Sequence, residues 1–425
     1  KDATELPTNM AVGASRSEAI ARRKGEITAA EAKALGVDWI FAPVVDLAVN
    51  PANPIVNLRA YGSEPGLVAG LASAYISGLH SRNAISCLKH FPGHGSTSVD
   101  SHLVLPVLER TLSDLESSEL KPYRALLGQA DSVMVGHLQV PALDPDDPAS
   151  FSRKIITGLL RGSLKYGGCV ITDALNMKAV SADSSAGLKA LLAGVDILLV
   201  PADPMLLYGT LCRAAAEGEV CEAAVDAALS RQNTLARKLS AGAMEPRDLS
   251  LVGCAEHRAF VREVSAGCLA WAFKNKPFAL KQGETVSYLE PLTPRAEWKG
   301  RAFVEELNRL GVRVAPFERG AAGKIVIGSF SKPRAFSGDI NLNRGAVAEI
   351  ENALSGGGTA LMAAFGSPFV FEDFHRRLAA GLCAFCGLAD FQRTAAAVLT
   401  GGASASGTMP VDLKLEQASA VKLDP

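Results

Sequence analysis

The residues best suited to chemistry lie in the segment KHFPGHGSTSVDSH, which runs from Lys89 to His102. Lys89 and His90 close an apolar run, and Asp100 and His102 follow on a loop that contains a proline and two glycines. An Asp two residues before a His can hydrogen-bond the imidazole, fix its tautomer and stabilise the imidazolium. Because an unperturbed imidazole has a pKa of about 6.5, such a pair suits acid and base catalysis near neutral pH. A surface turn that ends in Asp-Ser-His explains the same residues without chemistry.

Further polar residues close apolar runs in the same half of the chain. Asp46 ends the run WIFAPVVD, and Asp173 ends the run GGCVITD. His94 and His137 also follow expected strand ends. A charge at such a position is costly unless it faces solvent or a partner, so several of them together favour one shared site. Each one alone is equally well explained as a satisfied structural group.

The elements that must position these residues are short apolar runs separated by longer amphipathic stretches. The runs do not alternate with polar residues, which is typical of parallel strands covered on both faces. We expect strands at Trp39–Leu47, Ile85–His90, Ser132–Leu138, Cys169–Leu175 and Val195–Val200, and helices at Glu64–Ser81 and Thr111–Gln129. Ser113 and Glu116 have the spacing of a capping box. This order favours an α/β barrel or a doubly wound sheet, and in a barrel the carboxyl ends of the strands form the active face.

A second alternation begins near residue 284, after a region from 206 to 275 that we interpret as mainly helical. Strands are expected at Thr285–Leu289, Val312–Pro316, Lys324–Ser329, Thr359–Ala364 and Gly381–Gly387, with a helix at Gly345–Ala353. The break KNKPFALKQGE predicts a boundary between a barrel domain at 1–275 and a second α/β domain at 276–425.

The composition excludes several classes of protein. The chain has 425 residues, of which 48% are hydrophobic and 20% charged, so it can bury a large core and is not disordered. Its net charge is −1 and it has no polybasic run, so we expect neither nucleic acid nor a membrane surface as a partner. The first residues, KDATELPTNM, show no secretory signal. A small molecule is the expected partner.

The eight cysteines do not suggest a metal or redox site. Cys87 and Cys169 lie inside apolar runs, so we expect them to be buried small residues. Cys383 and Cys386 form a single CxxC in an apolar strand, without the second pair of ligands that zinc needs. The clustered His and Asp residues show no HxH or HExxH spacing. We therefore expect no metal and no cofactor.

These motifs resemble those of the family 3 glycoside hydrolases, in their β-N-acetylglucosaminidase branch. The segment KHFPGHGSTSVDSH with the following Leu105-Pro106 resembles the family signature, and ITDALNMKAV at 171–180 resembles its nucleophile strand. APVVDLAVNPANPIVNLRAYG at 42–62 resembles the segment with the sugar-binding Arg, and GASASGTMPVDL resembles the end of the second domain. The resemblance covers nearly the whole chain and is weakest between 206 and 320.

The resemblance implies a TIM-like (β/α)8 barrel followed by a three-layer α/β sandwich. It implies a retaining enzyme that releases terminal β-linked N-acetylglucosamine from cell-wall or chitin-type fragments. The implied roles are Asp173 as nucleophile, His102 as acid/base with Asp100 as its partner, and Arg59, Lys89 and His90 as sugar-binding residues. We further expect Asp46 to be a hydrogen-bonding scaffold residue, His94 to shape the loop, and His137 either to line the pocket or to be structural.

Two features of the resemblance leave alternatives open. The family barrel normally begins with two more strand–helix units, so we expect N-terminal strands to be missing from this chain and two sheet edges to be exposed. An inactive sugar-binding or scaffold relative is therefore an alternative, as is a β-glucosidase of the same family. A neutral imidazole acid/base does not repel an anion, so a phosphorylase of the same sugars is a third. In the second domain, Phe336–Asp339 is a plausible loop toward the barrel.

Overall fold

The computed structural model describes residues 3–101, 103–241, 247–292, 299–331 and 342–415. The described residues divide into two compact units, the first within 3–6 and 17–258, and the second within 7–16, 259–331 and 342–415. The domain limits 1–275 and 276–425 stay predictions. In the described part of the chain, no helix is long and apolar enough to cross a membrane.

The first unit contains parallel strands in chain order. Strands β1 (Cys87–Phe91), β2 (Ser132–Val135) and β3 (Cys169–Thr172) pair side by side. Parallel bridges extend the sheet on both sides, from Trp39 to Ile85 and from Ile171 to Ile197. The five expected runs are therefore neighbours in the expected order, as in a TIM-like barrel. No pairing among the described residues joins the first of these runs to the last.

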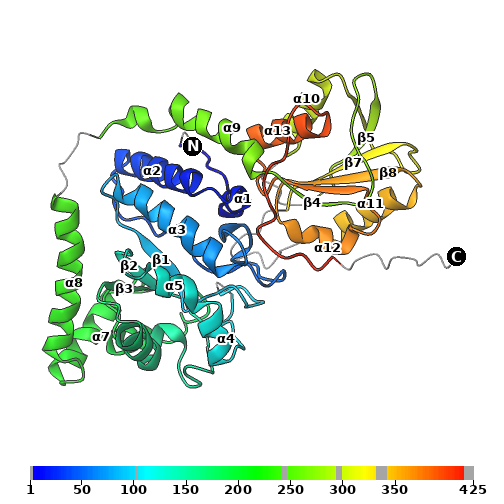
Figure 1. Ribbon diagram of the computed structural model, residues 1–425. Coiled ribbons are helices and arrows are strands. Elements are labelled where there is room, and N and C mark those ends of the chain that lie inside the picture. Colours follow the sequence, from blue (N-terminus) through cyan, green and yellow to red (C-terminus); the bar gives the residue numbers. More distant parts are fainter. Residues whose placement is uncertain (1–2, 102, 242–246, 293–298, 332–341, 416–425) are drawn as a thin grey trace. The chain divides into compact units, whose positions relative to one another are not determined.

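Helices connect and cover these strands (Figure 1). They are α2 (Glu18–Ala34), α3 (Pro65–His80), α4 (Leu112–Ser117), α5 (Leu120–Leu126), the π-helix η3 (Lys154–Ser163), α6 (Ala186–Ala193), α7 (Pro204–Ala216) and α8 (Glu222–Ala241), with short 3-10 turns η1 (Asn57–Arg59), η2 (Ala149–Phe151) and η4 (Leu249–Leu251). The single helix expected at Thr111–Gln129 is wrong, because it is divided into α4 and α5. Pro122 lacks the N–H that would bond to the carbonyl of Ser118, so one continuous helix is disfavoured.

The cap of α4 also differs from the expected one. Thr111 accepts a hydrogen bond from Asp114 N at 3.1 Å, and Asp114 Oδ2 accepts one from Thr111 N at 3.3 Å. The capping box is therefore Thr111–Asp114, and the predicted Ser113–Glu116 box is wrong. A helix that starts two residues earlier leaves Ser113 inside the first turn, where its hydroxyl cannot cap.

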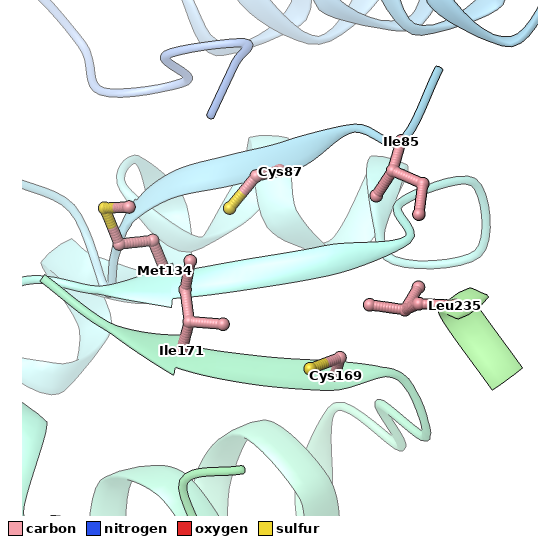
Figure 2. Close-up of a cluster of buried hydrophobic side chains, with 6 residues drawn as sticks. All are labelled: Ile85, Cys87, Met134, Cys169, Ile171 and Leu235. Atoms are coloured by element: carbon pink, nitrogen blue, oxygen red, sulfur yellow. The ribbon is translucent and has the colours of Figure 1, made fainter. Parts of the chain in front are cut away.

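The strands of the first unit share one apolar cluster, shown in Figure 2. Cys87 comes from β1 and Ile85 immediately precedes that strand, Met134 comes from β2, and Cys169 and Ile171 from β3, while Leu235 reaches them from α8. Cys87 is 0% exposed and Cys169 is 1% exposed. The prediction that these two cysteines are buried small residues is confirmed.

The second unit is a three-layer sandwich around one mixed sheet. Its strands are β4 (Ala270–Lys274), β5 (Thr285–Leu289), β6 (Arg313–Pro316), β7 (Lys324–Ser329), β8 (Thr359–Ala364) and β9 (Ala380–Cys383), in the spatial order β4-β9-β8-β7-β5-β6. Helices α10 (Arg301–Arg309) and α13 (Ala389–Leu399) cover one face, and α11 (Arg344–Ser355) and α12 (Phe371–Phe374) cover the other (Figure 1). The remaining helices are α1 (Asn9–Ser15), α9 (Ala255–Cys268) and the 3-10 turn η5 (Pro368–Val370).

One strand of this sheet departs from the sequence interpretation. The region 206–275 reads as mainly helical, but β4 follows α9 directly and pairs antiparallel with β9. All other pairs in the sheet are parallel, as expected for strands joined by helices. A five-residue strand at an edge is stabilised by a partner more than 100 residues away, so the local pattern carries little sign of it.

Candidate active site

The polar residues singled out in the sequence gather at the carboxyl ends of the parallel strands. Lys89 and His90 lie in the last three residues of β1, His137 follows β2, and Asp173 follows β3. Asp46 follows Val44, which forms a parallel bridge with Lys89. Because the carboxyl ends of parallel strands form one rim, these groups share one side of the first unit.

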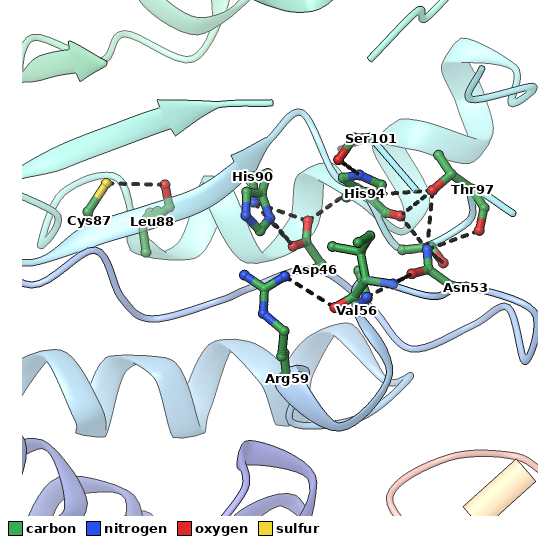
Figure 3. A network of polar contacts seen from close by, with 12 residues as sticks. Asp46, Asn53, Val56, Arg59, Cys87, Leu88, His90, His94, Thr97 and Ser101 are labelled. Carbon is green, nitrogen blue, oxygen red and sulfur yellow. Dashed lines mark hydrogen bonds and ion pairs between the residues drawn. The ribbon is translucent and has the colours of Figure 1, made fainter. Parts of the chain in front are cut away.

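Asp46 organises the centre of this rim and is 1% exposed. Its Oδ2 lies 2.7 Å from His90 Nδ1, and its Oδ1 accepts the backbone N–H of His94 at 2.7 Å (Figure 3). Burial alone would raise the pKa of Asp46, but the charge of His90 and its hydrogen bond outweigh burial and lower the pKa to about 2. The prediction that Asp46 is a hydrogen-bonding scaffold residue is confirmed.

An asparagine clamps the start of the loop that carries Asp100. Asn53 Nδ2 donates to the carbonyl of His94 at 2.8 Å and to that of Thr97 at 3.0 Å. Its Oδ1 accepts the N–H of Val56 at 2.7 Å (Figure 3). One buried amide therefore joins the segment before Arg59 to the loop after His90, 41 residues later in the sequence.

The ring of His94 is held inside the same loop. Its Nδ1 lies 2.8 Å from Thr97 Oγ1 and its Nε2 lies 3.0 Å from Ser101 Oγ (Figure 3). Burial, followed by the charge of His90, lowers the pKa of His94 to about 4. The ring is therefore neutral near pH 7, and both nitrogens have partners from the loop, as the sequence predicts for a residue that shapes it.

Two glycines let the loop pass close to its neighbours. A Cβ on Gly95 would lie 1.9 Å from the carbonyl oxygen of Leu47, which is shorter than any real contact. Gly93 has a φ of +132°, and a Cβ there would lie 2.7 Å from Cβ of Glu119. The buried carboxylate of Glu119 accepts the hydroxyl of Ser96. Backbone proximity therefore explains both glycines of the PGHG motif.

Two cations and three carboxylates of the rim influence one another electrostatically. Desolvation lowers the pKa of Arg59, while the carboxylates of Asp46, Asp173 and Asp100 raise it. Desolvation and then the charge of Arg59 lower the pKa of Lys89, and the carboxylates of Asp173 and Asp46 oppose this effect. Arg59 thus lies near all three carboxylates and Lys89 near two of them, and Figure 3 shows the Arg59 guanidinium beside Asp46 and His90.

Asp173 is kept ionised by its neighbours. Burial would raise its pKa, but the charge of His90, the N–H of Ala174 and the charge of Lys89 together lower it. The N–H of Ala174 donates to Oδ1 at 2.8 Å, and among the described residues no hydrogen bond to Oδ2 is seen. A half-buried carboxylate that is ionised at neutral pH is the form that can attack an electrophilic carbon.

His137 supports the turn that carries Asp173. Its Nδ1 lies 2.8 Å from Ser150 Oγ and its Nε2 lies 3.1 Å from the carbonyl oxygen of Ala174. A carbonyl only accepts, so Nε2 carries the proton and Nδ1 accepts the serine hydroxyl. Burial lowers the pKa of His137, so the ring is neutral. Of the two roles left open for His137, this geometry favours the structural one.

The structure therefore brings together most of the predicted site residues. Asp173, Asp100, Arg59, Lys89 and His90 gather at the rim, whereas His102 and Phe336–Asp339 lie outside the described residues. Sequence reasoning missed Asn53, Ser101 and Glu119, which position the loop. The only signal for Asn53 is an Asn-Pro pair in a loop, which is common in turns of every kind.

Comparisons with known proteins agree with this site. Residues 1–235 match the model of the glycosyl hydrolase family 3 N terminal domain. A Beta-hexosaminidase of Pseudomonas aeruginosa (strain LESB58) is 39% identical over 187 residues, which cover 43% of this chain and 56% of that protein. A Beta-N-acetylglucosaminidase/beta-glucosidase of Cellulomonas fimi is 30% identical over 289 residues, which cover 63% of this chain and 51% of that protein. The matched part thus spans about half the length of each curated relative.

A solved structure shows the same architecture over nearly the whole chain. It is a glycoside hydrolase family 3 β-N-acetylglucosaminidase from Paenibacillus sp. str. FPU-7, with a TM-score of 0.81 and 26% identity, covering 98% of this chain and 84% of that one. Barrel-type parallel strands followed by an α/β sandwich are thus shared by this chain and that structure. This chain belongs to glycoside hydrolase family 3.

Proposed function

We propose that this protein is a retaining glycosidase that releases terminal β-linked N-acetylglucosamine through a covalent intermediate on Asp173. The observation that carries the proposal is the ionised carboxylate of Asp173 at the end of β3, beside Lys89, His90 and Arg59. The names of the P. aeruginosa and C. fimi relatives support the choice of sugar. Cell-wall or chitin-type fragments are the substrates that contain this linkage.

The proposed reaction has two displacement steps. Asp173 Oδ2 attacks the anomeric carbon, the bond from this carbon to the leaving oxygen breaks, and His102 gives that oxygen a proton. Neutral His102 then takes a proton from water, whose oxygen displaces Asp173 from the anomeric carbon. His102 is assigned from the Asp-Ser-His motif, and its partner Asp100 is buried at the rim.

Sugar binding is assigned to groups that donate hydrogen bonds. Arg59 and Lys89 donate several bonds each and accept none, which suits hydroxyl oxygens held in one pose. Because Asp46 accepts the proton on His90 Nδ1, only Nε2 of His90 remains for a sugar hydroxyl. The Asp46 scaffold thereby fixes both the tautomer and the direction of this ring.

Phosphate is the second candidate acceptor. The acid/base in this proposal is an imidazole, and neutral imidazole does not repel an incoming anion as a second carboxylate would. Added inorganic phosphate would then raise turnover and give the sugar 1-phosphate. Unchanged turnover and free sugar as the only product would assign water as the acceptor.

The test compares this chain with its Asp173→Asn variant on chromogenic β-glycosides of N-acetylglucosamine and of glucose. Release from the N-acetylglucosaminide by the unchanged chain, and its loss in the variant, are expected. Activity on the glucoside alone would make the protein a β-glucosidase. No turnover in either chain, with equal affinity for the sugar, would identify an inactive sugar-binding relative and contradict the proposal.

A further inference from the structure

His94 is bound on every side by the loop that it begins. Its backbone N–H donates to Asp46 and its carbonyl accepts from Asn53, so its main chain is fixed to the rim. The residue is only 2% exposed, and its ring contacts the hydroxyls of Thr97 and Ser101. The ring therefore links the end of the strand to two residues farther along the loop, Thr97 and Ser101.

Ser101 is the more informative of these two points. It stands between Asp100 and His102 in the sequence and is 2% exposed. The carbonyl of Asp100 accepts the N–H groups of Leu103 at 2.9 Å and Val104 at 3.1 Å, so Asp100 is hydrogen-bonded to the residues that close this turn. Ser101 Oγ is the side-chain contact through which His94 Nε2 reaches that turn.

Burial keeps the ring of His94 neutral, and a neutral imidazole has one donor and one acceptor. Thr97 Oγ1 has one proton and lies 3.0 Å from the carbonyl of His94 as well as 2.8 Å from Nδ1. If Thr97 donates to the carbonyl, His94 Nδ1 donates to Thr97 and Nε2 accepts the hydroxyl proton of Ser101. If Thr97 donates to Nδ1, Nε2–H donates to Ser101. In both patterns Nε2 keeps its bond to Ser101.

We propose that His94 is a positioning residue for the acid/base pair, acting through the His94–Ser101 contact. This inference rests on the proposed function, because its consequence is the placement of Asp100 and His102 at the leaving oxygen. His94 does not bind the sugar, since both of its ring nitrogens are used within the loop. A small displacement of a proton donor lowers the rate without removing the groups that hold the substrate.

Two substitutions separate the two ring contacts. The amide of His94→Asn occupies the place of Nδ1 and can keep the Thr97 contact, whereas that of His94→Gln reaches the place of Nε2 and can keep the Ser101 contact. We expect His94→Asn and Ser101→Ala each to lower kcat roughly 10- to 100-fold with little change in KM, and His94→Gln to retain most of kcat. The double variant His94→Asn/Ser101→Ala should lose no more than the single variants, because both remove one contact.

The leaving group gives a readout that a purely structural role would not change. A nitrophenolate leaves without much help from an acid, whereas a sugar alkoxide needs its proton. The loss in His94→Asn should therefore be larger for an N-acetylglucosamine disaccharide than for the nitrophenyl glycoside. Equal losses on both substrates, equal effects of Asn and Gln, or additive losses in the double variant would overturn the proposal.

Hydrogen exchange tests the same contact without any activity. Amide exchange in residues 100–104 should be faster in His94→Asn and Ser101→Ala than in His94→Gln and the unchanged chain. If the unchanged chain turns over no glycoside, the proposed function fails while this measurement still tests the contact. Unchanged exchange in both His94→Asn and Ser101→Ala would overturn the positioning role by itself.

Discussion

Two histidine–carboxylate pairs lie at opposite ends of the same parallel strands. At the carboxyl ends, His90 Nδ1 and Asp46 Oδ2 are 2.7 Å apart, and at the amino ends His80 Nε2 and Asp131 Oδ2 are also 2.7 Å apart. The first pair has side chains 5% and 0% exposed, and the second has side chains 28% and 8% exposed. The two pairs thus have the same distance but differ in how far their side chains are exposed to solvent.

The amino-end pair joins elements and presents no group for catalysis. Asp131 accepts the backbone N–H of Ser86 at 2.8 Å and its hydroxyl at 2.9 Å, and it also accepts Lys238 of α8. Asp131 therefore connects α3, β1, β2 and α8 at the strand starts. The carboxyl-end pair instead orients a ring beside Asp173 and Lys89. The role of a histidine–carboxylate pair thus depends on which end of the strands it occupies and on how deeply it is buried, more than on the pair distance.

The strongest test of this contrast exchanges one carboxylate at each end for an amide. Asp173→Asn should lower kcat at least roughly 10³-fold, equivalent to about 4 kcal/mol, because an amide cannot form the glycosyl-enzyme. Asp131→Asn should leave kcat unchanged, because it lies at the other end of the strands. The measurement is kcat on a chromogenic N-acetylglucosaminide. Similar losses of kcat in both variants would contradict the assignment of catalysis to the carboxyl ends of the strands alone.

The second prediction concerns the free energy of unfolding. Asp46→Ala leaves the buried His90 without its acceptor and frees the N–H of His94, so it should cost about 3–5 kcal/mol. Denaturant unfolding of the unchanged chain and the variant measures this difference. A cost below about 1 kcal/mol, the value for an exposed pair, would show that the buried pair stabilises the fold no more than the exposed one.

The third prediction is a pH dependence from His94. Burial and the charge of His90 lower its pKa from 6.5 to about 4, so between these pH values the unfolded chain holds more protons than the folded one. Its contribution to stability is complete above about pH 6.5 and declines as the pH falls, by on the order of 3 kcal/mol at pH 4. Unfolding free energies of the unchanged chain and His94→Gln should therefore converge below pH 6. Parallel curves across this range would contradict the prediction.

The smallest effect is expected from His80→Gln. The His80 side chain is partly exposed, and Asp131 keeps Ser86 and Lys238 as partners, so the variant should lose at most about 1 kcal/mol of stability. Its kcat and KM should equal those of the unchanged chain. Thermal unfolding and steady-state kinetics measure both quantities, and a change in kcat would connect the amino ends to catalysis.

The sequence predicted the strands of both units because their side chains carry the information locally. Runs rich in Val, Ile and Leu predicted the three paired barrel strands and the five parallel strands of the sandwich, whereas the runs at 39–47 and 195–200 form only isolated parallel bridges. Asp46, His90, His137 and Asp173 were also predictable, since each one closes or follows such a run, whereas Arg59 and Asp100 were found through their motifs. The edge strand β4 and the break between α4 and α5 were missed, because a short strand or a kink is decided by partners and single residues more than by periodicity.

The sequence by itself determined which residue types stand at the strand ends and which motif carries Asp100 and His102. The tertiary structure alone decided how those residues are held. Asp46 reaches His90 44 residues later, and Asn53 reaches His94 41 residues later, and neither pair has a local pattern. Parallel strands bring such distant segments to one rim, and burial then requires every polar group there to find a partner. Periodicity thus specifies the strands, whereas hydrogen bonding between distant segments specifies the site.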